Sequence, residues 1–252
     1  MLEKSLAREW PRPTREYLRS ENLELERKNL QIIIAPPVAE EIKENPFLQT
    51  ALGDIYEFDS QLSKNRGSKY DFDTYRHSLR TANLISVAAG ELKLKPSTIK
   101  LLIWAALVHD VGKIKMPPAL IAKKGGLSVE EKSVHVSASL NYLKNLDAPE
   151  ELSDKLKYIV GCHHEKDSYP RSQPADRRKN SRPKEDRRKE VDADTEKAGH
   201  LFGIFDKLEA LSGRRNYKKI WSNAEIKDAL FKVYPESDDQ NRIKVLLEKI
   251  SS

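Results

Sequence analysis

The chain has 252 residues, of which 38% are hydrophobic, so it is long enough to bury a sizeable core in one large domain or two small ones. Its one cysteine, Cys162, excludes an internal disulfide, and the sequence lacks both the apolar run of a secretory signal and the 18 apolar residues of a membrane span. We therefore expect a soluble, cytoplasmic protein without a membrane partner, and the sequence leaves its oligomeric state open.

Most of the net charge of +6 comes from one segment, residues 171–190. This segment holds nine Lys or Arg against four Asp or Glu, a local balance of +5, and it has no apolar periodicity. Such a composition is typical of a solvated loop, and we expect a basic loop insertion at 171–194. A surface for nucleic acid or another anionic partner is the alternative.

The first 70 residues show weak secondary-structure signals. The run "LQIIIAPP" at 30–37 predicts a short strand or an extended arm that its prolines end, and one helix is expected near 38–60. We expect residues 1–70 to be an N-terminal extension that packs on the core without forming a domain of its own, and residues 71–252 to form the main domain.

Helical signals dominate the rest of the chain, so the predicted fold class is all-α. Asp73 is placed to cap a helix over 74–92, Pro96 to open one that runs to 110 and ends at Gly112, and Ser128 with Glu131 forms a capping box. Further helices are expected after Pro149, after Thr195, and over 223–232 and 239–250.

Five of the six histidines fall near predicted helix ends or on apolar helical faces, and a later apolar helix carries Asp206. The relevant residues are His77, His109 with Asp110, His135, His163 with His164, and Asp206. Imidazole and carboxylate are ligands for borderline and harder transition metals, and a buried aspartate without a cation costs several kcal/mol. The pattern predicts a metal site, although each residue alone has a structural explanation, such as a helix-dipole contact at His109. Cys162 is interpreted as a small hydrophobe rather than a thiolate ligand, and His200 as structural.

These residues resemble the HD superfamily of metal-dependent phosphohydrolases, and most closely its HD-GYP branch of cyclic-dinucleotide phosphodiesterases. The resemblance covers roughly residues 72–220. It is carried by "HDVGKIKMPPALIAKKGGLSVEE" from residue 109, by "HHE" at 163–165, and by "FDKLEALSGRRNY" from residue 205.

The resemblance implies an HD-domain helical bundle around a binuclear metal site that holds two divalent transition-metal ions, iron or manganese. The first ion would be held by His77, His109, Asp110 and Asp206. Asp110 would bridge to a second ion held by His135, His163 and His164. The resemblance further implies a metal-bridging hydroxide as nucleophile, with Asp110 and Lys113 as catalytic residues and Lys113, Asp167 and Arg215 as substrate-binding residues.

The implied function is hydrolysis of cyclic di-GMP, a related cyclic dinucleotide or another nucleotide phosphodiester in signalling. The loop that names the branch is altered, because "HHEKDSYP" at 163–170 is shorter than the family pattern and lacks both of its glycines. We therefore expect weak or shifted cyclic di-GMP cleavage. A non-catalytic HD-GYP-like signalling or nucleotide-binding module and a diiron HD-type oxygenase are the alternatives.

Overall fold

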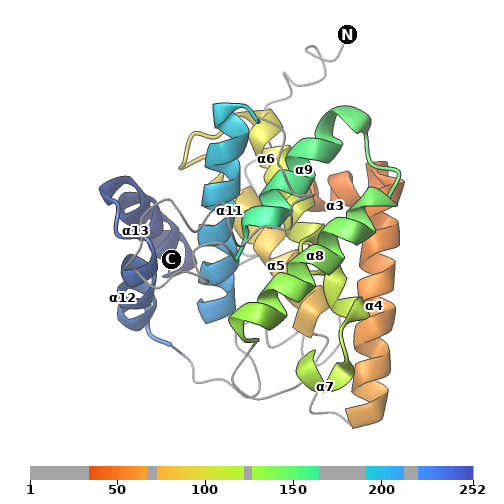
Figure 1. Ribbon diagram of the computed structural model, residues 1–252. Helices are drawn as coiled ribbons and strands as arrows, with labels where there is room; N and C mark the ends of the chain where they lie inside the picture. The colour runs from red at the N-terminus through yellow and green to blue at the C-terminus, as the bar shows by residue number, and fades with distance from the viewer. Residues whose placement is uncertain (1–33, 67–72, 122–126, 165–190, 213–220, 252) are drawn as a thin grey trace.

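The computed structural model of the chain describes residues 34–66, 73–121, 127–164, 191–212 and 221–251, and no β-strand occurs among them. The all-α prediction is therefore confirmed (Figure 1). The described helices, in chain order, are α3 (Pro36–Glu44), α4 (Pro46–Arg66), α5 (Asp73–Ala88), α6 (Pro96–Val108), the 3₁₀ helix η2 (Val111–Lys115), α7 (Pro118–Ile121), α8 (Val129–Lys144), α9 (Glu150–Cys162), α11 (Ala193–Ser212), α12 (Asn223–Val233) and α13 (Ser237–Ser251).

Helix α6 is the central element of the bundle. Its residues from Leu101 to Val108 are all buried, because the sequence is apolar around the whole circumference and a helix of that kind must be covered on every side. Helices α4, α5, α9 and α11 provide the cover. Trp104 of α6 packs edge-on against Phe47 of α4, with ring centroids 4.9 Å apart.

Helix α11 connects this core to the C-terminal helices. Phe202 and Phe205 on α11 are fully buried, and the helix contacts α5, α6 and α9 on the core side. The pair α12 and α13 packs against α11 and forms the blue end of the ribbon (Figure 1). Both helices occur where the sequence predicts them. In the described part of the chain no helix combines the length and hydropathy that a bilayer span needs.

The N-terminal region differs from the prediction. One helix was expected near 38–60, but α3 and α4 are separate helices that meet at Asn45, whose backbone is extended at φ −122° and ψ 97°. Pro46 explains the break, since a residue that precedes proline avoids the helical region. Of the strand or extended arm predicted at 30–37, the described part forms no strand. Ala35, the residue before α3, is buried and donates a hydrogen bond of 2.9 Å to Asn83 Oδ1, which fits the extended-arm alternative, and the helix begins at Pro36.

Several helix boundaries follow their sequence signals. The Ser128–Glu131 capping box begins α8, and Pro149 is the N-cap of α9. Helix α11 begins earlier than predicted, at Ala193, because Asp192 Oδ1 accepts the Thr195 N–H at 2.8 Å and satisfies the first turn. Helix α5 includes Asp73 as its first residue rather than following it.

Candidate metal centre

The site is built around the turn that follows α6. The helix ends at Val108, His109 caps it by donating its backbone N–H to Ala105 O, and Asp110 at φ −94° and ψ 2° turns the chain into η2. Both His109 and Asp110 are buried, with 1% and 2% of their surface exposed. Two consecutive polar side chains therefore point into the bundle at the end of its most apolar helix.

Gly112 holds this turn against α8. The sequence suggested that Gly112 ends α6, but the helix already ends at Val108. A Cβ atom at Gly112 would lie 2.3 Å from Ser139 N and 2.4 Å from His135 O, so only glycine allows the two backbones to approach so closely. Ser139 Oγ accepts the Gly112 N–H at 2.9 Å and donates to His109 O at 2.7 Å. The contact fixes the register between the turn and His135 on α8.

Replacing Gly112 by alanine is expected to lower the free energy of unfolding by about 3 kcal/mol, because the contacting atoms include backbone that cannot move aside. Urea unfolding measures the change. Gly53→Ala in α4 is the matched control, since nothing lies within 4 Å of its Cβ position and the change should be neutral or stabilising. Equal stability of Gly112→Ala and the parent protein would contradict the close approach.

The first cluster of polar side chains joins α5, the end of α6 and α11. His77 Nε2 lies 2.8 Å from Asp206 Oδ1 and 3.2 Å from His109 Nε2, and the distance from His109 Nε2 to Asp206 Oδ1 is 3.4 Å. All three residues are buried. Their ligand atoms lie close enough together to surround one metal ion.

The second cluster joins α8 to the end of α9. His135 Nε2 lies 3.1 Å from His163 Nε2, and the rings of His163 and His164 have centroids 4.1 Å apart. His135 and His163 are buried, whereas His164 is partly exposed. These three imidazoles could also hold a metal ion.

Asp110 lies between the two clusters. Its Oδ1 is 3.1 Å from His135 Nε2, while its Oδ2 is 3.6 Å from His109 Nε2 and 4.0 Å from His77 Nε2. One carboxylate oxygen therefore faces each cluster. Lys113, one turn further along η2, forms an ion pair with Oδ2.

Hydrogen bonds behind the clusters orient the imidazoles. His109 Nδ1 donates to Ala106 O at 2.9 Å and His163 Nδ1 donates to Val160 O at 2.6 Å, so in their neutral forms both rings present the Nε2 lone pair to the site. His135 Nδ1 is buried and has no hydrogen-bond partner among the described residues. Within each cluster, imidazole Nε2 atoms face one another at hydrogen-bonding distance. Lone pairs that converge in this way form a donor set that fits a cation.

The partner of His77 was not predicted from the sequence. Glu209 accepts from His77 Nδ1 through Oε2, and its Oε1 accepts from Arg80 Nε at 2.5 Å. The sequence patterns described above assign Glu209 no role. The sequence did hold a signal for this contact. Glu209 lies three residues after Asp206 on one helix, and Arg80 lies three residues after His77 on another, so each pair shares a helix face.

The pKa values of the cluster show where positive charge is favoured. Burial alone would lower the pKa of His77, but Glu209 and Asp206 raise it to about 9. Burial lowers the pKa of His135 and of His164 to about 4, so both are neutral near pH 7. Burial would raise the pKa of Asp110, but Lys113 and His109 hold it well below its usual value.

These shifts predict that the metal-free protein is most stable near pH 6.5 within the range from pH 4 to 8. Below pH 6.5, His135 and His164 bind protons in the unfolded chain but stay neutral in the folded protein. Each of these two histidines therefore lowers the free energy of unfolding by up to about 1.4 kcal/mol per pH unit, down to about pH 4. Above pH 6.5 the folded protein keeps a proton on His77 that the unfolded chain has lost. The stability that this proton contributes therefore falls as the pH rises towards the folded pKa of about 9. Urea unfolding with a chelator at several pH values measures this; a flat profile would contradict it.

The structure brings all seven predicted ligands together, and Lys113 lies beside them. Their role as ligands remains a prediction. Asp167, Arg215, the altered loop beyond His164 and the basic segment 171–190 lie outside the described residues. Cys162 is only partly buried and belongs to none of the candidate metal groups in the described part, and His200 pairs with Asp239 at 2.6 Å instead.

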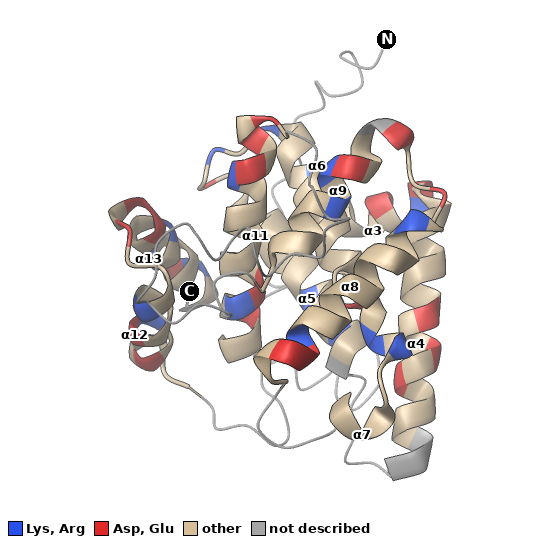
Figure 2. Ribbon diagram, viewed as in Figure 1, with Lys and Arg blue, Asp and Glu red and all other residues tan. Residues whose placement is uncertain are grey.

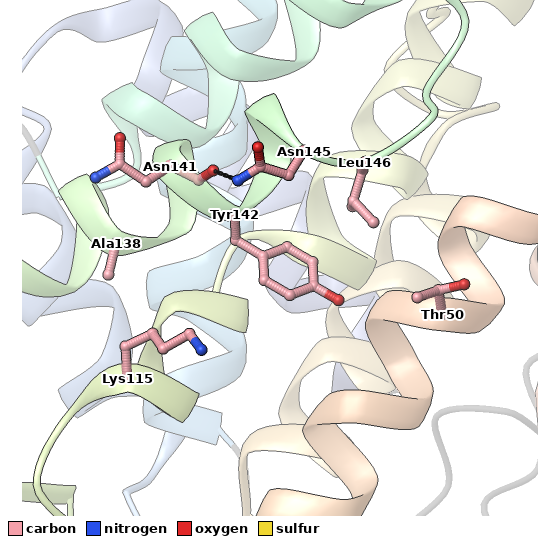
Figure 3. A pocket seen from close by; sticks show the side chains of 7 residues that line it. All are labelled: Thr50, Lys115, Ala138, Asn141, Tyr142, Asn145 and Leu146. Atoms are coloured by element: carbon pink, nitrogen blue, oxygen red, sulfur yellow. Dashed lines mark hydrogen bonds between the residues drawn. The ribbon is translucent and has the colours of Figure 1, made fainter.

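A pocket of about 530 Å³ lies on another face of α8, between this helix, α4 and η2 (Figure 3). Its lining consists of Thr50, Lys115, Ala138, Asn141, Tyr142, Asn145 and Leu146. The Tyr142 hydroxyl donates to Asp54 Oδ2 at 2.5 Å and ties α8 to α4. None of the seven predicted ligands lines this pocket, so it is separate from the metal centre.

Comparison with known proteins identifies the domain. A family model described as the HD domain matches residues 74–211, which is more than half of the chain. The chain is 25% identical over 182 residues to the 3'3'-cGAMP-specific phosphodiesterase 2 of Vibrio cholerae, a match that covers 70% of this chain and 31% of that protein. It is 25% identical over 173 residues to the cyclic di-GMP phosphodiesterase of Thermotoga maritima, covering 66% of this chain and 41% of that protein.

A structural match is found to the HD domain of the L. monocytogenes phosphodiesterase PgpH in complex with cyclic-di-AMP. The match has a TM-score of 0.45 and 19% sequence identity, and it covers 70% of this chain and 88% of that chain. The chain spans only about a third to two fifths of the length of the two curated relatives.

Proposed function

The chain belongs to the HD domain family, and from this premise we propose that it is a metal-dependent phosphodiesterase that hydrolyses a cyclic dinucleotide or another nucleotide phosphodiester. The observation that carries the proposal is the position of Asp110, with one carboxylate oxygen toward each of two histidine clusters and Lys113 beside it. The names of the two curated relatives, both cyclic-dinucleotide phosphodiesterases, support the substrate class.

The residues that would hold two divalent ions, iron or manganese, fall into two sets that share Asp110. His77, His109, Asp110 and Asp206 would hold the first ion, and His135, His163, His164 and Asp110 the second. When bound, two such ions acidify a water molecule to provide the nucleophile and neutralise the phosphoryl oxygens.

The protein's own residues position these groups and the substrate. Backbone carbonyls fix the rings of His109 and His163, and Glu209, itself held by Arg80, fixes the ring of His77. Lys113 carries a positive charge that can stabilise the charge that develops on the phosphoryl oxygens. We propose that Asp167 and Arg215 contribute to binding of the substrate.

The experiment is to purify the protein from cells supplied with iron or with manganese, to measure metal content by elemental analysis and to assay a panel of diesters. The panel contains cyclic di-GMP, other cyclic dinucleotides, linear dinucleotides and bis(p-nitrophenyl) phosphate. We expect two metal ions per chain and hydrolysis of at least one dinucleotide.

Other outcomes would identify the alternatives. Bound metal without turnover of any diester would favour a non-catalytic nucleotide-binding module, and oxygen-dependent turnover with bound iron would favour an oxygenase. Because "HHEKDSYP" lacks the glycines that allow a backbone to approach a ligand closely, we propose that cyclic di-GMP is cleaved weakly or less well than another cyclic dinucleotide.

A further inference from the structure

The hydroxyl of Ser139 joins α8 to the turn that follows α6. Ser139 is fully buried and lies one helical turn after His135, so both side chains leave the same face of α8. His135 belongs to the second cluster of the candidate metal centre, whereas the turn carries His109 of the first cluster and Asp110 between the two. Ser139 therefore lies where the two halves of the centre meet.

The Ser139 hydroxyl holds the turn on both sides of Asp110. It donates to His109 O at 2.7 Å and accepts the Gly112 N–H at 2.9 Å. The carbonyl belongs to the peptide bond that joins His109 to Asp110, and the N–H lies two residues after Asp110. A hydroxyl has one proton, which is used for His109 O, so its lone pairs remain for Gly112. Both bonds go to backbone groups and leave the carboxylate of Asp110 to the two clusters.

The contact between Ser139 and the turn involves no charged side chain of α8. Residues 133–143 of this helix are uncharged, and the helix is tan in Figure 2 between charged residues at its two ends. Helix α8 therefore holds the turn without adding a charge that would compete with a metal ion for Asp110.

Asp110 depends on this contact more than His109 does. His109 is tied to its own helix, because its Nδ1 donates to Ala106 O at 2.9 Å. The carboxylate of Asp110 lies beyond the end of α6, and its Oδ1 must stay near His135 Nε2, now 3.1 Å away, if one carboxylate is to face both clusters. Loss of the Ser139 hydroxyl would therefore release Asp110 from α8 while His109 stays with α6.

We infer that Ser139 is a positioning residue that sets the distance between the two halves of the metal centre, so that two ions can share Asp110. This inference rests on the proposed function for the presence of two ions, but it does not depend on the reaction or the substrate. A role in packing alone would affect both ions equally, whereas a positioning role affects the second ion and the coupling between the ions.

The test is titration of Mn²⁺ into metal-free parent protein and metal-free Ser139→Ala, followed by electron paramagnetic resonance. Two Mn²⁺ ions that share a carboxylate are magnetically coupled, so their spectrum differs from that of isolated ions. We expect the parent protein to bind two coupled ions. Ser139→Ala should bind the first ion with a Kd changed less than about twofold and the second about 10- to 100-fold more weakly, the usual loss for an outer partner of a metal ligand. Its spectrum should be that of isolated Mn²⁺.

Two buried residues provide the controls. Ser86→Ala removes a hydroxyl that is buried in α5 and has no hydrogen-bond partner in the described part of the chain, so it should leave both ions in place. Leu143→Ala creates a cavity one turn beyond Ser139 on the same helix, so it should lower the free energy of unfolding without releasing the second ion. If Ser139→Ala does not fold, Ser139→Cys, which keeps a weaker donor and acceptor, should show a smaller loss of the second ion.

The titration separates this inference from the proposed function, because it needs no turnover. If the parent protein binds two coupled ions and Ser139→Ala loses the second, the inference is supported even when no diester is hydrolysed, and only the proposed function fails. Unchanged Kd values and coupling in Ser139→Ala, an equal loss of both ions, or fewer than two ions in the parent protein would overturn the inference. So would a loss of the second ion in Leu143→Ala as large as that in Ser139→Ala.

Discussion

Replacement of Asp110 by alanine is expected to remove both metal ions and all phosphodiesterase turnover. One of its oxygens faces His135 and the other faces His109, so the change would take a proposed ligand from each cluster at once. The loss of metal affinity should be at least about 100-fold, since outer partners of metal ligands alone account for 10- to 100-fold. Elemental analysis after dialysis measures the metal content, and the same samples are assayed for turnover.

His135→Ala provides the control for the bridging role of Asp110. It removes a residue of the second cluster only, so we expect one ion per chain to remain with His77, His109 and Asp206. If Asp110→Ala retained two ions, or if His135→Ala lost both, the two clusters would not share the carboxylate as proposed. Circular dichroism of each variant distinguishes loss of metal from loss of the fold, because a metal site also contributes to stability.

The helices were predictable because their signals are local. Proline at the start of α6, the capping box before α8 and the apolar periodicity of α5 each act within a few residues, and the structure follows all three. The break between α3 and α4 had a local signal too, in Pro46, which the prediction of one helix near 38–60 did not use.

The clustering of the proposed ligands could be predicted from the sequence, because buried imidazoles and carboxylates at helix ends have few alternatives to a cation. Their outer partners could not be predicted. The hydrogen bond from His77 to Glu209 joins positions 132 residues apart, and the reason for Gly112 becomes visible only when η2 and α8 are side by side.

Lys113→Ala is expected to reduce turnover of a phosphodiester by about 100-fold or more while leaving the metal content unchanged. Lys113 forms an ion pair with Asp110 Oδ2 but belongs to none of the candidate metal groups among the described residues. Its ammonium group can therefore act on the phosphoryl oxygens of a bound substrate, and loss of one charge-stabilising group of this kind costs about 10²- to 10³-fold in kcat. Steady-state kinetics and elemental analysis on the same preparation provide both numbers.

Lys115→Ala is the matched control for this prediction, because Lys115 lies two residues further along η2 but is exposed and lines the separate pocket between α4 and α8 (Figure 3). It should change turnover by less than about twofold. The assays are run at pH 7 or above, since loss of Lys113 removes a positive charge that keeps the pKa of Asp110 low. If Lys113→Ala lost metal in proportion to its activity, Lys113 would act by holding Asp110 in place, and its direct role at the phosphoryl group would be wrong.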